Sequence, residues 1–436
     1  MEWIKEHKNN LMDFGLFLLL FIISFVVSFM IIHLWGDQIL CYGFSYNISK
    51  RMIIYKDFNA VPTPLYFMIA SIFIKIFGNY VISLGILDSL FMAAIGFILF
   101  KMIGYKGFIP FLFFIVFVPS PYNLMCLFFI FMILYCIHKE KYNDLFIAFI
   151  VGLVFITKQN IGVLLFIPMI LYSKHKIKSI IIFTLPFLFL CIYFLYHQAL
   201  YDFFDYAFFG LFDFSGNRYF NYSLLFITIC CVIYLLFPVF KSRIQDKEAL
   251  YILFFQFLIY PICDIHHFSP CFVLFLYYFL KKCKSKKIDI AICSLVCMYT
   301  VYAFCCVFMP IHISTKKDFL YLKSPFGLSN YMEEIYEKFD GDIENVYFDS
   351  DTSYLLKLYY DIPASKFDLF FDGNLGYFSK EKNIKELEEH CQKEKCTFII
   401  YKDYGKDYQG TVLHDFITKH YKKIEEFHGR EVYSSK

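Results

Sequence analysis

The sequence predicts an α-helical polytopic membrane protein with a small α/β domain at its C-terminal end. The 436 residues are 59% hydrophobic and only 18% charged, whereas soluble domains average about 45–50% apolar and about 25% charged residues. The apolar residues form runs such as 14–35, and a run of about 20 residues is enough to cross the hydrocarbon core. From about residue 316, charged residues become frequent and the apolar runs shrink to strand length.

Twelve apolar segments are candidate membrane spans, and several of them are short for a full crossing. The first follows a short charged N-terminus and is too long for the core of a signal peptide, so we expect a signal anchor that stays in the membrane. The candidates are residues 14–35, 64–78, 80–101, 108–118, 121–138, 143–157, 160–173, 179–198, 222–240, 249–263, 267–280 and 289–311.

Basic clusters between the spans predict the orientation, because Lys and Arg mark cytoplasmic loops. Clusters at 174–178, 241–247 and 281–287 predict cytoplasmic loops, so the loops at 202–213 and 264–267 between them are expected outside. The last span then leads outward and gives an extracytoplasmic C-terminal domain. With a cytoplasmic N-terminus, one of the twelve candidates must fail to cross, so we expect about eleven transmembrane helices.

We expect two domains, a transmembrane domain over residues 1–315 and a soluble α/β domain over residues 316–436. Short apolar runs in the second domain predict buried strands, and apolar positions three to four residues apart predict amphipathic helices. The predicted strands are 346–349 and 397–402, and the predicted helices are 383–394 and 411–422.

The cysteines and charges exclude several classes of site. Most of the 15 cysteines lie inside apolar runs, where cysteine behaves as a small hydrophobic residue. Cys391 and Cys396 have no second pair or nearby histidines for a zinc site, and no disulfide framework is recognisable. The basic clusters are too short for a nucleic-acid surface, and nucleotide- and dinucleotide-binding motifs are absent. We therefore expect no nucleic-acid partner and no cofactor.

Asp37 is the candidate catalytic residue. It follows the first apolar run directly and has no basic neighbour close in sequence. A carboxylate at the water interface can stay ionised and accept a proton from an incoming hydroxyl, as a general base must. The alternative is an interfacial aspartate that only ends a helix.

A second candidate is the group Asp264, His266 and His267 between two late spans. An aspartate with two histidines can hold a phosphate, relay a proton or bind a metal. Ionisable residues so close to the membrane are functional candidates by default, although a polar cap between two spans is the simpler interpretation.

A third candidate is Lys158, which lies with Gln159 and Asn160 between two apolar half-helices. An ammonium group in hydrocarbon is costly, so the side chain either lines a polar cavity or reaches the interface. Phosphate is a natural partner for such a cation. Arg51 and Lys56 in the first loop are similar candidates, as is Arg218. The break at 119–121 is a further pointer to a polar interior.

Taken in order, these segments resemble the GT-C superfamily of membrane glycosyltransferases, nearest the bacterial protein O-mannosyltransferases and aminoarabinose transferases. The acidic residue after the first span matches at 35–37. The pattern "Y-x-D-F … P-P-L-Y" matches at 55–58 and 62–66, with Thr63 between the prolines. The pattern "G-L-x-x-x-T-K-Q-N" matches at 152–160, and "P-x-x-D-x-x-H" matches at 261–267.

The resemblance implies transfer of a sugar from a polyprenyl-phosphate donor to an acceptor hydroxyl at the outer face of a bacterial plasma membrane. Asp37 would be the base, and the acceptor would be a lipid, a glycan or a protein. Many relatives carry an acidic pair where this chain has Asp37 and Gln38, so a bound divalent metal is not supported. The substrate-binding candidates are Arg51, Lys56, Asp57, Tyr66, Lys158, Gln159, Asn160, Asp264, His266 and His267.

Two other functions remain open at this point. A transporter or flippase of a lipid-linked glycan explains the broken spans and Lys158 equally well, but often shows internal repeats, and none is visible here. A receptor or assembly protein would bind through the external α/β domain and use the spans only as an anchor. So many spans with polar breaks exceed what an anchor needs.

Overall fold

The structure is a computed structural model, and its compact parts are two units. Unit 1 comprises Met1–His33, Ile82–Ile192 and Arg218–His312, and unit 2 comprises Leu34–Val81, Tyr193–Asn217 and Ile313–Lys436. Each unit is described by itself. The residues described are 2–30, 37–58, 60, 62–78, 81–140, 143–210, 219–260, 262–285, 287, 291, 294, 295, 298, 328–348, 352–368, 381–401 and 411–434.

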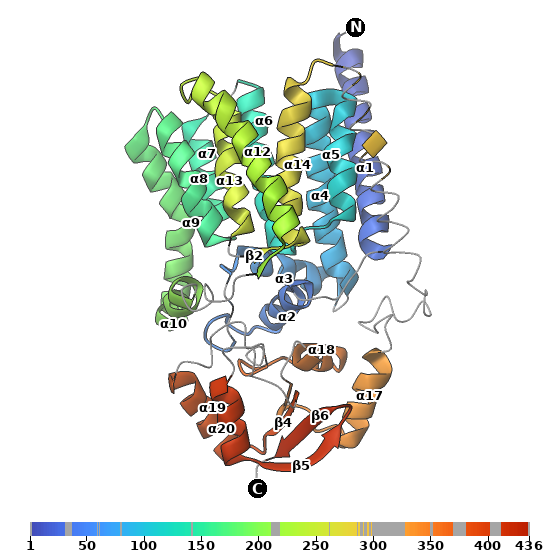
Figure 1. The fold of residues 1–436 in the computed structure, drawn as a ribbon, viewed down its shortest axis with the longest axis vertical. Coiled ribbons are helices and arrows are strands. Elements are labelled where there is room, and N and C mark those ends of the chain that lie inside the picture. The colour runs from blue at the N-terminus through green and yellow to red at the C-terminus, as the bar shows by residue number, and fades with distance from the viewer. Residues whose placement is uncertain are drawn as a thin grey trace. The chain divides into compact units, whose positions relative to one another are not determined.

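Unit 1 is a bundle of helices that run side by side (Figure 1). A two-stranded parallel pairing of β1 with β2 joins two of its connections. The elements are α1 (Glu2–Met30), α4 (Val81–Ile103), η1 (Gly104–Gly107), α5 (Phe108–Val116), α6 (Pro121–His138), α7 (Asp144–Phe155), α8 (Gln159–Tyr172), α9 (Lys176–Tyr196), β1 (Tyr219–Phe220), α12 (Tyr222–Lys241), α13 (Lys247–Phe255), η3 (Gln256–Ile259), β2 (Ile262–Cys263) and α14 (Ile265–Lys282). The last residues of α9 belong to unit 2.

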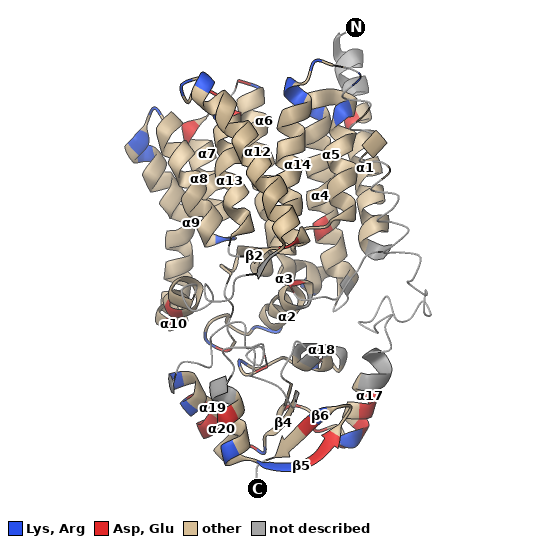
Figure 2. Cartoon of the chain, in the orientation of Figure 1, with Lys and Arg blue, Asp and Glu red and all other residues tan. Residues whose placement is uncertain are grey.

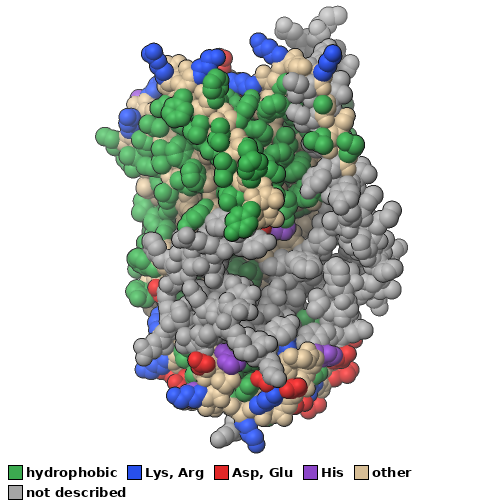
Figure 3. Space-filling view, in the orientation of Figure 1, with side chains coloured by type: hydrophobic (Ala, Val, Ile, Leu, Met, Phe, Trp, Pro, Cys, Tyr) green, Lys and Arg blue, Asp and Glu red, His purple; other side chains and the backbone are tan. Residues whose placement is uncertain are grey.

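Five helical segments in the described part of the chain are long and apolar enough to cross a membrane. Hydrophobic side chains cover the visible flank of the bundle (Figure 3), as expected of helices that face lipid. The chain therefore has helices of the kind found in membrane proteins. The predicted span 289–311 lies almost entirely outside the described residues. The five segments are Asn10–Ser28, Ile82–Val116, Pro121–His138, Lys176–Tyr196 and Tyr222–Lys241.

Lys and Arg gather at one end of the bundle (Figure 2). Three ion pairs tie helices together there. Lys101 Nζ lies 2.5 Å from Asp13 Oδ1, Lys281 Nζ lies 2.6 Å from Glu248 Oε1, and Lys282 Nζ lies 3.1 Å from Asp246 Oδ2. The exposed fractions of the six side chains lie between 8% and 50%. Buried tyrosines add to the contacts of α14 with α13, because Tyr277 donates to Glu248 and Tyr278 donates to Asp246.

We expect Asp246→Asn to destabilise the protein at neutral pH and to matter less in acid. Burial raises the pKa of the Asp246 carboxyl, but hydrogen bonds from Ala249 N–H, Tyr278 and Lys282 lower it more, so the pKa lies below its ordinary value of 3.8. A depressed pKa contributes stability above the unfolded pKa and loses it as the pH falls through the folded pKa. The loss at pH 7 should be about 1 kcal/mol.

Melting temperatures of the purified protein in detergent, measured against pH, test this expectation. The difference in melting temperature between the wild type and Asp246→Asn should stay constant between neutral pH and about pH 4. It should disappear at lower pH. Asp415, whose side chain is 81% exposed, supplies the matched control Asp415→Asn, which should show no gap. A gap for Asp246→Asn that widens in acid would contradict the assignment.

The two apolar segments around Lys158, which were interpreted as half-helices of a broken span, form a tight hairpin of α7 and α8. Gly162 of α8 lies so close to α7 that a Cβ atom there would be 2.2 Å from Phe155 Cα. Only glycine permits this approach. The hairpin holds Lys158 at the reversal of the chain, where it precedes α8 in extended conformation.

Unit 2 combines the first loop of the chain, a short helical segment after α9 and the C-terminal domain. Its C-terminal part is Ile313–Lys436, and the unit also includes 34–81 and 193–217. The elements are α2 (Asp37–Ser49), α3 (Leu65–Phe77), α10 (Leu200–Phe204), the π-helical turn η2 (Asp205–Phe209), α17 (Leu328–Lys338), β3 (Val346–Phe348), α18 (Thr352–Tyr359), α19 (Glu381–Lys393), β4 (Thr397–Tyr401), α20 (Thr411–His420), β5 (Lys422–Phe427) and β6 (Arg430–Ser434).

The C-terminal sheet has the strand order β3-β4-β6-β5, with β3 parallel to β4 and the other pairs antiparallel. The predicted strands correspond to β3 and β4, and the predicted helices correspond to α19 and α20. The hairpin of β5 and β6 was not predicted from the sequence. β5 consists mostly of charged residues, two lysines and two glutamates, and all of its residues but Phe427 are exposed, so they carry no apolar signal of a buried strand.

A buried ion pair fixes the centre of this domain. Lys357 Nζ lies 2.7 Å from Asp368, and the two side chains are 1% and 0% exposed. Ser353 and Ser365 also donate to the Asp368 carboxylate. Burial lowers the pKa of Lys357 despite the adjacent carboxylate. A buried charge pair is costly unless its hydrogen bonds are complete, and here four donor groups satisfy the carboxylate.

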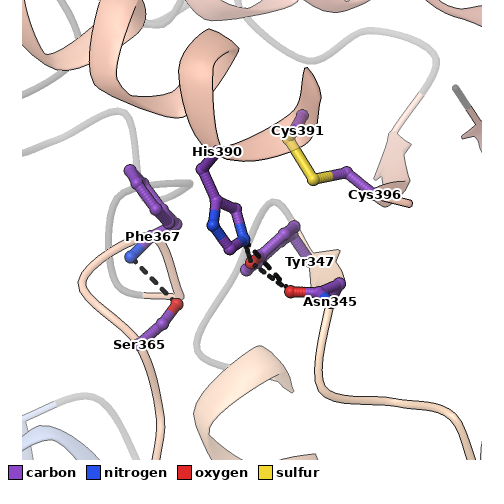
Figure 4. Close-up of a disulfide and its surroundings, with 7 residues drawn as sticks. All are labelled: Asn345, Tyr347, Ser365, Phe367, His390, Cys391 and Cys396. Atoms are coloured by element: carbon purple, nitrogen blue, oxygen red, sulfur yellow. Dashed lines mark hydrogen bonds between the residues drawn. A yellow bond between two sulfur atoms is a disulfide. The ribbon is translucent and has the colours of Figure 1, made fainter. Parts of the chain in front are cut away.

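Cys391 at the end of α19 and Cys396 before β4 form a disulfide (Figure 4). Next to it, His390 Nε2 lies 3.0 Å from Tyr347 Oη and 3.1 Å from Asn345 Oδ1. Burial lowers the pKa of His390. This disulfide was not predicted, because one pair of cysteines has no pattern of spacing to compare.

Candidate functional site

The structure distributes the predicted site residues over the two units. Those of the first loop lie in unit 2, and those of the later segments lie in unit 1. Arg218 and the loop around it lie outside the described residues. The unit 2 group is Asp37, Arg51, Lys56, Asp57 and Tyr66, and the unit 1 group is Lys158, Gln159, Asn160, Asp264, His266 and His267.

Asp37 is the first residue of α2. The first part of the loop after the first span is this 13-residue helix. A carboxylate in the first turn is stabilised by the positive end of the helix dipole. Asp37 is half-buried. A carboxylate at this position is the kind of group that can serve as a general base.

The other end of α2 carries Arg51 in the left-handed conformation, with φ of 72°. Met52 N–H donates to Asn47 O (3.1 Å) and Arg51 N–H donates to Ile48 O (3.0 Å), which is the hydrogen-bond pattern of a Schellman cap. Glycine usually occupies this position. The same cap ends α12 at Arg243, so the geometry alone does not mark a functional residue. The side chains of Arg51 and Arg243 are both exposed, and Arg51 differs in its place in the first loop, between Asp37 and Lys56.

The loop after Arg51 is held by buried contacts. Tyr55, with φ of 71°, is 1% exposed, packs against Phe194 and Phe203 and donates to Pro62 O (2.8 Å). Asp57 Oδ2 accepts Ile53 N–H at 2.6 Å. Asp57 therefore closes the turn.

The four predicted substrate-binding residues of unit 2 fall into two buried or engaged residues and two exposed ones. Tyr66 is fully buried on α3, and Asp57 is committed to its turn. Arg51 and Lys56 are exposed. A loop whose backbone is held in place and that carries two exposed cations is suited to bind an anion, because little backbone entropy remains to be lost.

In unit 1, the α7–α8 turn meets the beginning of α6. Lys158 Nζ donates to Asn123 Oδ1 (2.9 Å) and lies 5.0 Å from the centre of the Tyr122 ring. Asn123 is fully buried, and its Nδ2 has no hydrogen-bond partner among the residues that the structure describes. A buried donor without an acceptor is costly, so Asn123 Nδ2 is a candidate donor to a polar ligand.

Sequence reasoning missed Asn123. The signal was its position two residues after Pro121, at a break that predicts a polar interior. Gln159 is buried at the start of α8 and Asn160 is half-buried. Asn160 Oδ1 accepts Ile161 N–H, so its side chain pairs with a backbone N–H group in the first turn of α8.

Asp264 and His267 form a pair at the beginning of α14. Asp264 Oδ1 accepts His267 N–H (2.9 Å) and lies 2.8 Å from His267 Nδ1, so it is the N-terminal cap of the helix. Burial raises the pKa of Asp264, but the hydrogen bonds and charge of His267 outweigh it, so the pKa lies below its usual value. His266 Nδ1 lies 3.0 Å from Val118 O. Within the described residues, no three or more His, Cys, Asp or Glu side chains are grouped to hold a metal ion.

Comparisons of the chain with models of protein families, with curated proteins and with solved structures find no match. By its fold, the chain is mostly helical, with five described helical segments long and apolar enough to cross a membrane and a small C-terminal sheet. Its activity is a matter for proposal.

Proposed function

We propose that the chain is a membrane glycosyltransferase that moves a sugar from a polyprenyl-phosphate donor to an acceptor hydroxyl at the outer face of the membrane. The observation that carries the proposal is the first loop. Within unit 2, α2 begins at a half-buried carboxylate, Asp37, and the rigid loop after α2 presents Arg51 and Lys56. A base and two cations are the groups that such a transfer requires.

In the proposed reaction, the Asp37 carboxylate takes the proton of the acceptor hydroxyl. The acceptor oxygen forms a bond to the anomeric carbon as the bond from that carbon to the phosphate oxygen breaks. The polyprenyl phosphate leaves with the electron pair of that bond. Negative charge grows on the leaving phosphate, and fixed cations placed beforehand lower the barrier. Arg51 offers two parallel N–H donors, and Lys56 offers a point charge.

A second function is supported by a different observation. The Lys158–Asn123 pair lies among apolar helices of unit 1, and Asn123 Nδ2 has no partner within the described part of the chain. A flippase of a lipid-linked glycan needs such donors along its path. A flippase needs no general base. The two functions therefore differ in whether a covalent product forms.

The test is transfer of a radiolabelled sugar from polyprenyl-phosphate donors to endogenous acceptors in membranes with and without the chain. Label that becomes covalently attached to an acceptor only when the chain is present supports the transferase. Donor that crosses the bilayer without covalent transfer supports the flippase. If neither occurs with a panel of donor sugars, both proposals fail.

We further propose that the Lys- and Arg-rich end of the bundle faces the cytoplasm of a bacterial cell and that about eleven helices cross. Positive residues in short loops determine orientation, and Figure 2 shows them gathered at one end. The candidate that does not cross would be α3. Its 13 residues span about 20 Å, short of the roughly 30 Å hydrocarbon core, and it packs against α2 within unit 2.

The disulfide supports an extracytoplasmic C-terminal domain, because disulfides persist in oxidising compartments and are rare in the cytosol. We expect the Cys391–Cys396 bond to be present in protein taken from cells into excess alkylating agent. Trypsin should then release residues 386–393 linked to residues 396–402, which mass spectrometry detects directly. Finding both peptides alkylated instead would place the domain in a reducing compartment.

The same bond gives an expectation for stability. Closing so short a loop restricts the unfolded chain by about 2 kcal/mol in the chain-entropy account. Cys391→Ser with Cys396→Ser should lower the stability of the C-terminal domain by about that amount, as seen in resistance to proteolysis. Cys283→Ser is the matched control, since Cys283 is a free cysteine in unit 1. Equal resistance of the double variant and the wild type would contradict the expectation.

A further inference from the structure

The C-terminal domain holds the end of α2 through one side chain. Asn47 is fully buried. Its Nδ2 donates to Ala364 O (2.9 Å), and its Oδ1 accepts Ala364 N–H (3.2 Å). Both polar groups of the amide and both backbone groups of Ala364 are thus paired. A residue of the first loop is fixed to a residue 317 positions later in the chain.

Asp361 adds a second attachment. Its carboxylate accepts Tyr46 Oη (2.7 Å) and Lys50 Nζ (3.1 Å). Asp361 is itself left-handed, with φ of 58°, at the end of α18, and α18 packs against α2. The Asp361 side chain is 61% exposed and that of Lys50 is 38% exposed, so this pair contributes less than the Asn47 bonds.

Asn47 also begins the cap that sets Arg51. Its carbonyl oxygen accepts Met52 N–H, the outer hydrogen bond of the cap. One residue therefore joins the C-terminal domain through its side chain to the loop through its backbone. Any shift of Asn47 must move the cap, and with it Arg51 and the turn that carries Lys56.

We propose that Asn47 is a positioning residue for sugar transfer, through which the C-terminal domain fixes the cation-bearing loop in its working geometry. This inference rests on the proposed transferase function. The C-terminal domain is then a support of the reaction centre and not only a binding module. A misplacement of about 1 Å costs on the order of 100-fold in rate, which sets the size of the expected effect.

The test joins two measurements on the full-length protein in detergent or nanodiscs. Asn47→Ala should lower kcat for transfer on the order of 100-fold while KM for the donor changes little. Hydrogen exchange of residues 47–58 should rise, and exchange of β4 should stay as in the wild type. Tyr347→Phe is the control, because it removes hydrogen bonds in the same domain without touching α2, and it should leave kcat unchanged.

The outcomes separate the two proposals. Absence of transfer by the wild type overturns the proposed function, whereas faster exchange of residues 47–58 in Asn47→Ala still supports the attachment. Faster exchange with unchanged kcat overturns the positioning role and leaves the transferase in place. If Asn47→Ala also raises hydrogen exchange of β4, the substitution has disturbed the C-terminal domain itself. Two substitutions of the exposed Asp361 then decide between the outcomes. Asp361→Ala should lower kcat severalfold, and Asp361→Asn, which keeps an acceptor for Tyr46, should restore most of it. Equal kcat for Asp361→Ala and the wild type would then overturn the inference.

Discussion

Asp37→Asn is expected to lower sugar transfer by about 10²–10⁴-fold, the range attributed to a general base. Asparagine has nearly the same shape as aspartate and can still begin α2, since both residues are favoured at helix beginnings. It cannot accept a proton from the acceptor hydroxyl. Folding and donor binding should therefore persist while kcat falls. Transfer is measured in membranes at matched expression.

The matched control is Asp202→Asn on α10, a second carboxylate of unit 2 at the start of a helix. Its partner is Lys382, at 3.4 Å in an exposed ion pair, so its loss should change transfer less than twofold. If Asp37→Asn transfers as fast as the wild type, Asp37 is not the base. A fall that is equal for both variants would point to stability instead of chemistry.

Arg51→Gly is expected to lower transfer about 100-fold without loss of stability. Arg51 occupies a left-handed cap position, where glycine is unstrained, so the substitution relieves backbone strain. The flexibility that glycine adds to the unfolded chain offsets part of this gain. Removal of one fixed donor to a charge that develops in the transition state costs about 10²–10³-fold in rate.

Arg243→Gly is the control for this substitution, because Arg243 ends α12 in the same cap with φ of 49°. Melting temperature and transfer are measured for both variants. Both should melt no lower than the wild type, and only Arg51→Gly should lose transfer. Full transfer by Arg51→Gly would remove Arg51 from the anion site, and a large drop in its melting temperature would show that the side chain supports the fold.

The helices of the membrane part and two strands of the C-terminal sheet were predictable from the sequence. Membrane insertion depends on the hydrophobicity of about 20 consecutive residues, and the runs behind α1, α4, α6, α9 and α12 have that property. Strands β3 and β4 are short apolar runs between charged residues. Strand β5 was missed, because an exposed edge strand has no hydrophobic pattern to recognise.

The candidate site was predictable only as a set of residue types. The sequence marks Asp37, Arg51 and Lys158 as ionisable groups near apolar runs, which is a local property. It did not mark Asn47 or Asn123, which are ordinary polar residues until their partners are known. The sequence also did not show that Asp57 closes its own turn or that Asp264 caps α14. These roles are visible only in the hydrogen bonds of the structure.

The sequence by itself determined that this protein has helices able to enter a membrane and a C-terminal α/β domain, because hydrophobicity and charge act within short stretches of chain. Only the tertiary structure decided that the first loop and the C-terminal domain share one unit, that Cys391 pairs with Cys396, and that Asn47 bonds to Ala364. Such pairings depend on which surfaces pack together. Packing is a property of the folded chain as a whole, and no local pattern encodes it.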